Sequence, residues 1–317
     1  TNIKGVINMN IKKIGLTALA ASLVSVSAHA GEMSVAGGAS IGLKNTSKTS
    51  TGKSWTMGNQ LTFTGSGELD NGLNVALSFI IDQGDDTAAT GEARDNTSPF
   101  DSHSVTISSD ELGSLKFSGE GGSSAQSEID TTAAGDAWNN GSSITVSASE
   151  SGDNSMLYTL PTIVEDVVAK VSYSPGGANG GSATAWRLGY TGVDGLTVDY
   201  AVGDTETVGS KAEATTMKAS YAYSSFTVSY SNNDYDTEGS TGGQDIDSWN
   251  IAYTVNDDIS VAFGTENHEA EGSSVDEEVE YANISYTTGG VTLSASQYNY
   301  EGDGNNAGAA GEKERWA

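Results

Sequence analysis

Cysteine is absent from this chain of 317 residues, and basic side chains are scarce. Without cysteine no disulfide bond forms, so an exported protein of this length must be held together in some other way. The chain has 14 Lys and Arg against 42 Asp and Glu, which gives a formal net charge of −28. Because a negative field of this size repels DNA and RNA, we expect no nucleic-acid partner.

Apolar stretches long enough to cross a membrane as a helix are also missing. Residues 14–26 are apolar or small, but this run of 13 residues is shorter than the about 20 that a spanning helix needs. Two lysines precede the run, and "AHAGE" (28–32) follows it with small residues on either side of a histidine. This order is that of a secretory signal peptide. We therefore predict upstream read-through over residues 1–8, a signal peptide over 9–30 and a mature chain of 31–317. The alternative for the apolar run is a short buried helix.

Hydrophobicity alternates with a period of two along the mature chain. Clear examples are "LNVALSFII" (73–81), "LTVDYAV" (196–202), "FTVSYS" (226–231) and "WNIAYTV" (249–255). This period predicts β-strands with one apolar and one polar face. The polar face carries mainly Ser, Thr, Ala, Gly and Asn, whereas a solvent-exposed sheet uses more Lys and Glu to prevent edge pairing. Small polar side chains suit a water-filled lumen, so we favour a transmembrane barrel over a water-soluble sandwich.

The connections between the strands alternate between short and long. Short turns are expected at 68–72, 111–113, 161–166, 193–195, 224–225, 256–258 and 289–290. Longer acidic or glycine-rich loops are expected at 45–54, 83–101, 120–153, 176–182, 204–212, 232–245, 267–276 and 301–311. This regular alternation predicts an all-β, antiparallel, up-and-down transmembrane barrel of about 16 strands. The last strand, "EKERWA" (312–317), is shorter than the about 9–11 residues of a spanning strand, which predicts that the natural chain continues and that this strand is truncated here.

Three stretches of the chain resemble gram-negative general porins. They are "ELGSLKFSGEGG" (111–122), "DNSMLYTLP" (153–161) and "EKERWA" (312–317), and the resemblance covers residues 9–317. It implies a third loop, 120–153, that folds into the barrel between the fifth and sixth strands. It also implies a homotrimer in the outer membrane that lets small hydrophilic solutes and ions diffuse passively, and not an enzyme.

The acidic residues of the inward loop are the first candidates for a pore constriction. A barrel of about 16 strands leaves an aqueous channel, and charges on a loop inside it set the selectivity. The candidates are Glu120, Glu128, Asp130 and Asp136, and we expect Glu128 and Asp130 at the narrowest point. The alternative is that these acids are ordinary solvated loop charges.

Basic residues at lumen-facing strand positions are the second set of candidates. By alternation these are Lys116, Lys170, Arg187 and Lys218. Placing such a cation against the lipid midplane costs about 2–4 kcal/mol, which favours the inward direction. An acidic loop facing a basic wall would orient solutes, and the excess of acids predicts a mild preference for cations. The alternative is structural pairing, or side chains that reach to the rim.

One acidic segment, "DYDTEGSTGGQD" (234–245), approaches the pattern of a calcium-binding loop. Its candidate ligands are Asp234, Asp236, Glu238 and Asp245. The alternative is a solvated outer loop. Divalent ions such as Ca²⁺ are also expected to bridge acidic loops to one another or to lipopolysaccharide, which with outer-membrane lipid is a predicted partner. No other cofactor is expected.

Two other classes of function remain open from the sequence. A secreted, acidic, calcium-binding surface or adhesive β-protein fits the same composition, and would be soluble without detergent and carry no current. An outer-membrane enzyme would have to use His103 or His268, the histidines of the mature chain after residue 30. No nucleophile elbow accompanies them.

Overall fold

The computed structural model describes most of the mature chain. The described residues are 32–46, 53–82, 101–140, 142, 145–149, 153–175, 181–207, 209–239, 242–305, 307 and 311–317. The predicted read-through and signal peptide lie outside them, as do most of the loops expected at 45–54 and 83–101. Among the described residues, no helix is long and apolar enough to cross a membrane.

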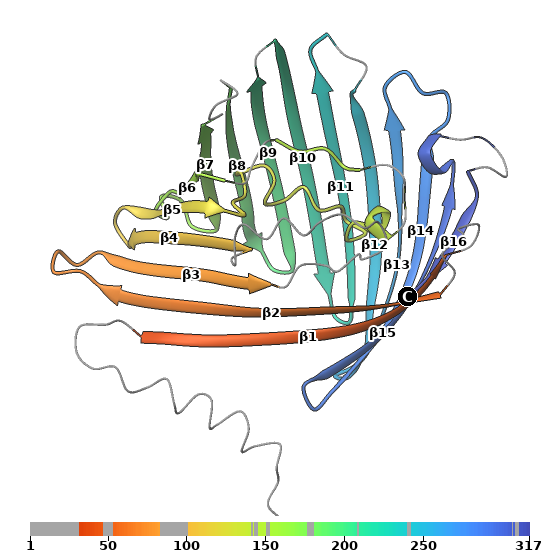
Figure 1. Cartoon of the computed structure of the whole chain (residues 1–317), viewed down its shortest axis with the longest axis horizontal. Coiled ribbons are helices and arrows are strands. Elements are labelled where there is room, and N and C mark those ends of the chain that lie inside the picture. Colours follow the sequence, from red (N-terminus) through yellow and green to blue (C-terminus); the bar gives the residue numbers. More distant parts are fainter. Residues whose placement is uncertain are drawn as a thin grey trace, which may run out of the picture.

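Sixteen antiparallel strands form a closed barrel in which each strand pairs with its neighbours in sequence and β1 pairs with β16 (Figure 1). This confirms the predicted architecture. The first eight strands are β1 (Glu32–Thr46), β2 (Lys53–Glu68), β3 (Asn74–Asp82), β4 (Ser102–Ser109), β5 (Gly113–Glu120), β6 (Ser155–Thr159), β7 (Val167–Pro175) and β8 (Ser182–Val193). The others are β9 (Leu196–Thr207), β10 (Ser210–Tyr223), β11 (Phe226–Thr237), β12 (Gln244–Asn256), β13 (Ile259–Ala270), β14 (Glu277–Thr288), β15 (Val291–Glu301) and β16 (Lys313–Trp316).

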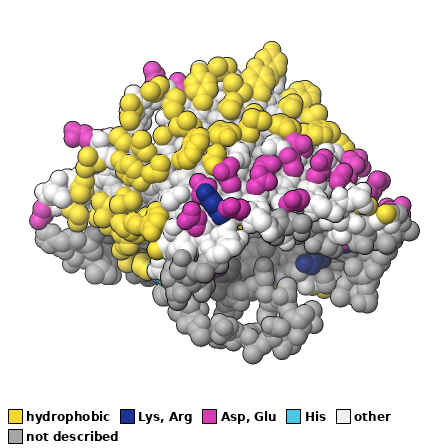
Figure 2. Space-filling model, turned by 90° about the horizontal axis from the view of Figure 1, so that it is seen from above, with side chains coloured by type: hydrophobic (Ala, Val, Ile, Leu, Met, Phe, Trp, Pro, Cys, Tyr) yellow, Lys and Arg dark blue, Asp and Glu magenta, His cyan; other side chains and the backbone are white. Residues whose placement is uncertain are grey.

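The outer surface of the barrel carries the apolar side chains of the alternating pattern. On β12, Trp249, Ile251 and Tyr253 point outward and are exposed. Their ring neighbours lie on the adjacent strands: Trp249 is 5.6 Å from Phe263 and Tyr253 is 4.6 Å from Phe226, between ring centroids. Figure 2 shows hydrophobic side chains gathered over a broad area, with a row of Asp and Glu side chains along its border. An apolar band with aromatic residues near its edges is the surface that a barrel presents to lipid.

The short turns lie where the alternating pattern predicts them, for example at Ser224 between β10 and β11 and at Gly289–Gly290 between β14 and β15. Several of the long loops, those expected at 204–212, 232–245 and 267–276, are shorter than expected. Strand β9 runs on to Thr207, β10 begins at Ser210, and β11 runs on to Thr237. The physical reason is that hydrogen-bonded pairing continues above the apolar band, where outward side chains become polar and the hydrophobic alternation that reveals a strand is lost.

The barrel closes through few pairs. Strand β16 meets β1 at Asn45↔Trp316 and Thr46↔Arg315, and it pairs with β15 from Tyr300↔Lys313 to Gln297↔Trp316. The short stretch predicted as the last strand is therefore a strand, and it joins the two edges of the sheet.

The buried side chains lie inside the barrel, between its wall and the segment that connects β5 with β6. One apolar cluster joins Ala134 and Ala137 of this segment to Val279 and Tyr300 of the wall. A second cluster joins Ala125 of the segment to Leu157 and Ala185 of the wall. The core of this protein is thus the contact between an inward loop and one side of the barrel.

Candidate functional site

Residues 121–154 connect β5 with β6, and their described part lies inside the barrel and runs across several strands (Figure 1). We call this segment the inner loop. It begins at Gly121 with φ +65°, where a Cβ would meet Ser102 Cβ at 2.6 Å, and it ends at Asn154 with φ +59°. Both positions need the left-handed backbone conformation that glycine and asparagine adopt most readily. The predicted inward third loop is therefore present, and the sequence turns the chain inward at both ends.

One cross-strand row of inward-facing residues underlies the middle of the inner loop. Register partners along this row are Asp199, Lys218, Ser231, Ser248, Glu266, Val279 and Tyr300, on strands β9 to β15. Small hydroxyl side chains in the row leave space for a polypeptide to lie directly on the sheet. The loop supplies small residues in turn, because Ala133, Ala134 and Ala137 are buried against it.

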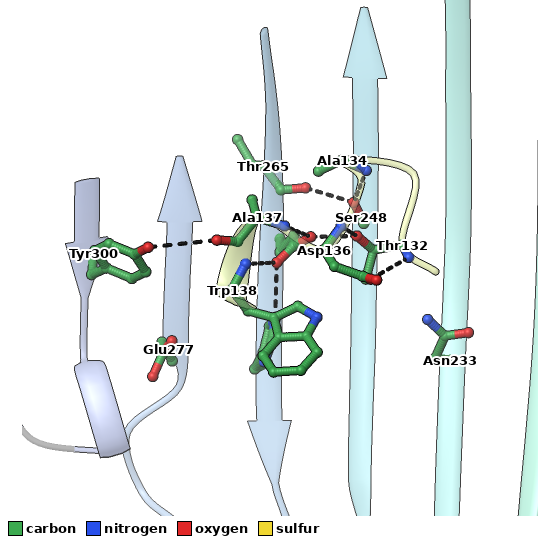
Figure 3. A network of polar contacts seen from close by, with 12 residues as sticks. Thr132, Ala134, Asp136, Ala137, Trp138, Asn233, Ser248, Thr265, Glu277 and Tyr300 are labelled. Atoms are coloured by element: carbon green, nitrogen blue, oxygen red, sulfur yellow. Dashed lines mark hydrogen bonds and ion pairs between the residues drawn. The ribbon is translucent and has the colours of Figure 1, made fainter. Parts of the chain in front are cut away.

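The inner loop bonds to this row strand by strand. Its backbone N–H groups at Ala133 and Ala134 donate to Ser231 Oγ at 2.7 Å and Ser248 Oγ at 2.9 Å. Figure 3 shows the loop segment with Thr132, Ala134 and Trp138 lying across the strands that carry Ser248 and Tyr300. Since buried backbone groups need partners, wall side chains here take the place of a neighbouring strand.

Glu266 is the fully buried one of the three charged residues in the row. Its side chain is fully buried, and its carboxylate accepts hydrogen bonds from Ala137 N and Trp138 N, both at 2.8 Å, and from Thr132 Oγ1. The two N–H groups open the short 3₁₀ helix η1 (Ala137–Asn140), where backbone donors have no partner within the helix. An ionised carboxylate at that point satisfies donors that would otherwise be buried without acceptors.

The start of the inner loop is held by an ionic cluster. Lys170 Nζ on β7 lies 2.7 Å from Glu128 Oε2, and Arg187 Nη1 on β8 lies 3.1 Å from the same oxygen. Arg187 also donates to Asp199 Oδ1 on β9, through Nε at 2.9 Å and Nη2 at 2.8 Å. Glu128, Lys170 and Arg187 were each predicted from the sequence and the structure brings them together. The cations contact the loop directly, instead of facing it across an open pore.

Lys218 on β10 lies next to the other acids of the loop. Its Nζ donates to the Thr131 carbonyl at 2.6 Å. Burial, and after it the charge of Asp136, raises the pKa of the Asp130 carboxyl from 3.8 to about 6. Asp136 itself closes a turn, since its Oδ1 accepts from Thr132 N at 2.9 Å and its N–H donates to Thr132 Oγ1 at 2.8 Å.

The remaining predicted constriction residues lie apart from this cluster. Glu120 ends strand β5, where its Oε2 is 3.9 Å from His103 Nδ1. Lys116 lies on β5 opposite Leu157, and within the described part of the chain it makes no ion pair. Their roles at a constriction, like those of the clustered residues, stay predictions. The two histidines considered for an enzyme lie on separate strands, His103 on β4 and His268 on β13.

The structure places three of the four candidate calcium ligands of segment 234–245 on strands, and calcium binding there stays a prediction. Asp234 and Asp236 belong to strand β11 and Asp245 to β12, with Asp234 and Asp245 as register partners. Asn233 faces inward, because its Nδ2 donates to the Asp130 carbonyl, so its neighbour Asp234 faces outward. Only Glu238 of the four candidates follows the strand. Within the described residues no three His, Asp or Glu side chains are placed to hold a metal ion.

The end of the inner loop also lies on the wall. Residues 145–149, which carry an alternating sequence, form no strand. Ser149 N donates to Gln126 Oε1 at 2.8 Å, and Ser147 N donates to Gln244 Oε1 at 3.1 Å. Gly203 on β9 makes room for this segment, because a Cβ there would lie 2.4 Å from Ser149 Cβ.

Sequence reasoning missed the acceptors on the wall. Asp199, Ser231, Ser248 and Glu266 all occupy inward positions of strands. Asp199 and Glu266 could have been found as acidic residues that occupy, in the period-two alternation of a strand, the same positions as the small polar residues. The expectation of an acidic loop facing a basic wall favours basic residues at these positions and passes over acidic ones.

Comparison with known proteins shows which proteins this barrel resembles. The sequence model of the Gram-negative porin family matches residues 15–310. A loop-deletion mutant of OmpT, an outer membrane protein of Vibrio cholerae, has a similar structure with a TM-score of 0.65 at 16% identity, over 90% of this chain and 97% of that one. A triple mutant of Rhodopseudomonas blastica porin has a TM-score of 0.65 at 16% identity, over 90% of this chain and 98% of that one. No curated protein matches the sequence.

Proposed function

Since the chain belongs to the Gram-negative porin family and is an outer-membrane β-barrel channel, we propose that it lets small hydrophilic solutes diffuse passively and prefers cations mildly. The inner loop narrows the lumen, because it lies against the inside of the wall from β7 to β15. Solutes pass between this loop and the opposite side of the barrel.

The observation that carries the cation preference is the pairing of Glu128 with Lys170 and Arg187. Together with Asp199, these residues form a group of two cations and two carboxylates, whose charges cancel. The other two cations of the predicted wall are Lys218, which lies near both Asp130 and Asp136, and Lys116, which lies on the strand that ends at Glu120. The surplus near the constriction is therefore acidic, which lowers the energy of a passing cation.

The proposal is tested by reversal potentials of the refolded protein in a planar bilayer. With a tenfold KCl gradient across the bilayer, we expect an ohmic current whose reversal potential has the sign of a cation-preferring pore. A reversal potential of anion sign would overturn the cation preference. A protein that inserts without carrying current would overturn passive diffusion as well.

The cation preference is expected to fall as the pH is lowered through about 6. The Asp130 carboxyl, whose pKa burial raises to about 6, is ionised above that pH and neutral below it. One unit charge about 4 Å from a passing ion is worth about 1 kcal/mol in water, so the permeability ratio should drop by up to about fivefold. Reversal potentials at pH 8 and pH 5 measure this, and Asp130→Asn should remove the step. A step of equal size in that variant would assign the titration to another group.

The proposed partners follow from the outer surface. Strands β1 and β2 expose Met33, Ile41, Trp55 and Met57, which suit lipid or the neighbouring subunit of a homotrimer. Above the apolar band the outward residues are acidic, as at Asp234 and the residues near it. Such a surface meets the phosphates of lipopolysaccharide through divalent cations. Migration of the folded protein on native gels tests the homotrimer. The same gels run with a chelator test the bridging to lipopolysaccharide by divalent cations.

A further inference from the structure

We infer that the inner loop is fastened to the wall at two separate places, and that Glu266 positions its far half and keeps the pore open. The near half is residues 124–130 and the far half is residues 131–140. This inference rests on the proposed function, because the inner loop has to be the part that limits the pore.

The near half has its own fastening. Ala125 N donates to Ser172 Oγ on β7 at 2.9 Å, and Gln126 Nε2 donates to Thr216 Oγ1 on β10 at 2.8 Å. The Glu128 carboxylate adds the ion pairs to Lys170 and Arg187. None of these bonds involves Glu266 or strand β13. Losing the far fastening therefore leaves the near half in place.

The far half depends on Glu266 for its charged hydrogen bonds. Among the described wall residues that accept a loop N–H, Glu266 is the charged one, while Ser231 and Ser248 supply single neutral bonds. The carboxylate receives three donors from residues 132–138. Hydrogen bonds to an ionised acceptor are about twice as strong as neutral ones. Glu266 thus outweighs the two serines combined.

The surroundings of Glu266 fix the carboxylate itself. His268 Nε2 lies 3.5 Å from Glu266 Oε2, and both side chains are buried. Val279, the register partner of Glu266 on β14, is buried in the apolar cluster with Ala134, Ala137 and Tyr300. The carboxylate is therefore held in the wall and cannot follow the loop if the loop moves. Glu277, a second buried carboxylate on β14, already accepts from Gly304 N at 2.9 Å, so a released far half exchanges its bonds to Glu266 mainly for bonds to water in the lumen.

The position of the far half determines whether its release narrows or widens the pore. The far half lies flat on the wall, so any detachment moves it into the lumen and narrows the pore. Glu266→Ala is expected to produce brief partial closures, with the time spent in the reduced level rising at least about tenfold, as the loss of one charged hydrogen bond implies. Glu266→Gln should lie between wild type and Glu266→Ala. Its oxygen still accepts from the loop, but its amide group opposes one loop N–H with another donor.

The experiment compares single-channel records of these variants with one control, Glu280→Gln, which removes an exposed carboxylate on the outer face of β14. This control should give closures close to those of wild type. Because Glu266 lies in the barrel wall, Thr132→Val provides a variant that leaves the wall intact. It removes from the loop both a donor to Glu266 and the acceptor of Asp136 N–H. It should raise the closures in the same direction as Glu266→Gln.

A structural readout separates loop release from general loosening of the barrel. The chain has no cysteine, so single spin labels can be attached at Ser123→Cys beside the near half and at Asn139→Cys in the far half. Glu266→Ala should make the label at residue 139 mobile and leave the label at residue 123 unchanged. Equal mobility at both sites, or wild-type closures in Glu266→Ala and Thr132→Val, would overturn the inference. A wild-type channel without cation preference would refute the proposed selectivity and leave this result standing.

Discussion

Ile251→Arg is expected to lower the free energy of unfolding by about 2–4 kcal/mol, the cost of an arginine on the lipid face near the bilayer midplane. Ile251 lies on the outer face of β12, between the outward rings of Trp249 and Tyr253, and it is 42% exposed. The measurement is equilibrium unfolding in urea of protein folded into lipid vesicles, followed by tryptophan fluorescence and by the shift of the folded band on unheated gels.

The matched control is the adjacent position. Ala252→Arg places the same side chain on the inner face of β12, where water is available, so stability should stay within about 0.5 kcal/mol of wild type. The arginine would instead reduce the conductance by occupying the lumen. Equal destabilisation of the two variants would mean that the two faces do not differ in solvent, and the assignment of lipid and lumen would then be wrong.

Removing both cations of the ionic cluster is expected to strengthen the cation preference about fivefold. In the double variant Lys170→Met and Arg187→Gln, the carboxylates of Glu128 and Asp199 lose their counterions and expose two negative charges near the pore. A single unpaired charge about 4 Å from a passing ion contributes about 1 kcal/mol in water, and screening by salt limits the sum. Reversal potentials in a KCl gradient give the permeability ratio directly.

A charge-removal control for this pair is Lys211→Gln. Lys211 lies at the outer end of β10, where it is 3.8 Å from Asp204 and its side chain is 48% exposed. Its loss should change the permeability ratio little. If the double variant has the selectivity of wild type while its conductance is normal, ions pass elsewhere than beside the inner loop.

The barrel was predictable because its surface repeats one physical rule at every strand. In "WNIAYTV" (249–255) or "FTVSYS" (226–231), lipid on one side and water on the other force alternation, and each short turn interrupts it. The rule fails above the apolar band. Asp234 and Asp236 continue strand β11 with polar residues on both faces, so the sequence there reads as a loop.

The site was predictable only in its parts. Lys170 and Arg187 were identified because a cation in a strand must avoid lipid, and Glu128 because it lies in the inward loop. Their direct contact depends on where the loop lies on the wall, which neither pattern encodes. Glu266 was overlooked since a fully buried carboxylate becomes favourable only when three donors from a distant segment reach it.

The way the inner loop lies across the strands has a consequence for assembly. Its bonds reach Ser231 on β11, Ser248 on β12 and Glu266 on β13, residues that come side by side only after these strands have paired. A slip of one residue between two of the strands would turn such an acceptor outward into lipid. The loop therefore docks after these strands have paired, and it docks fully only where they have paired correctly, so that its docking is an internal check on the register of the sheet.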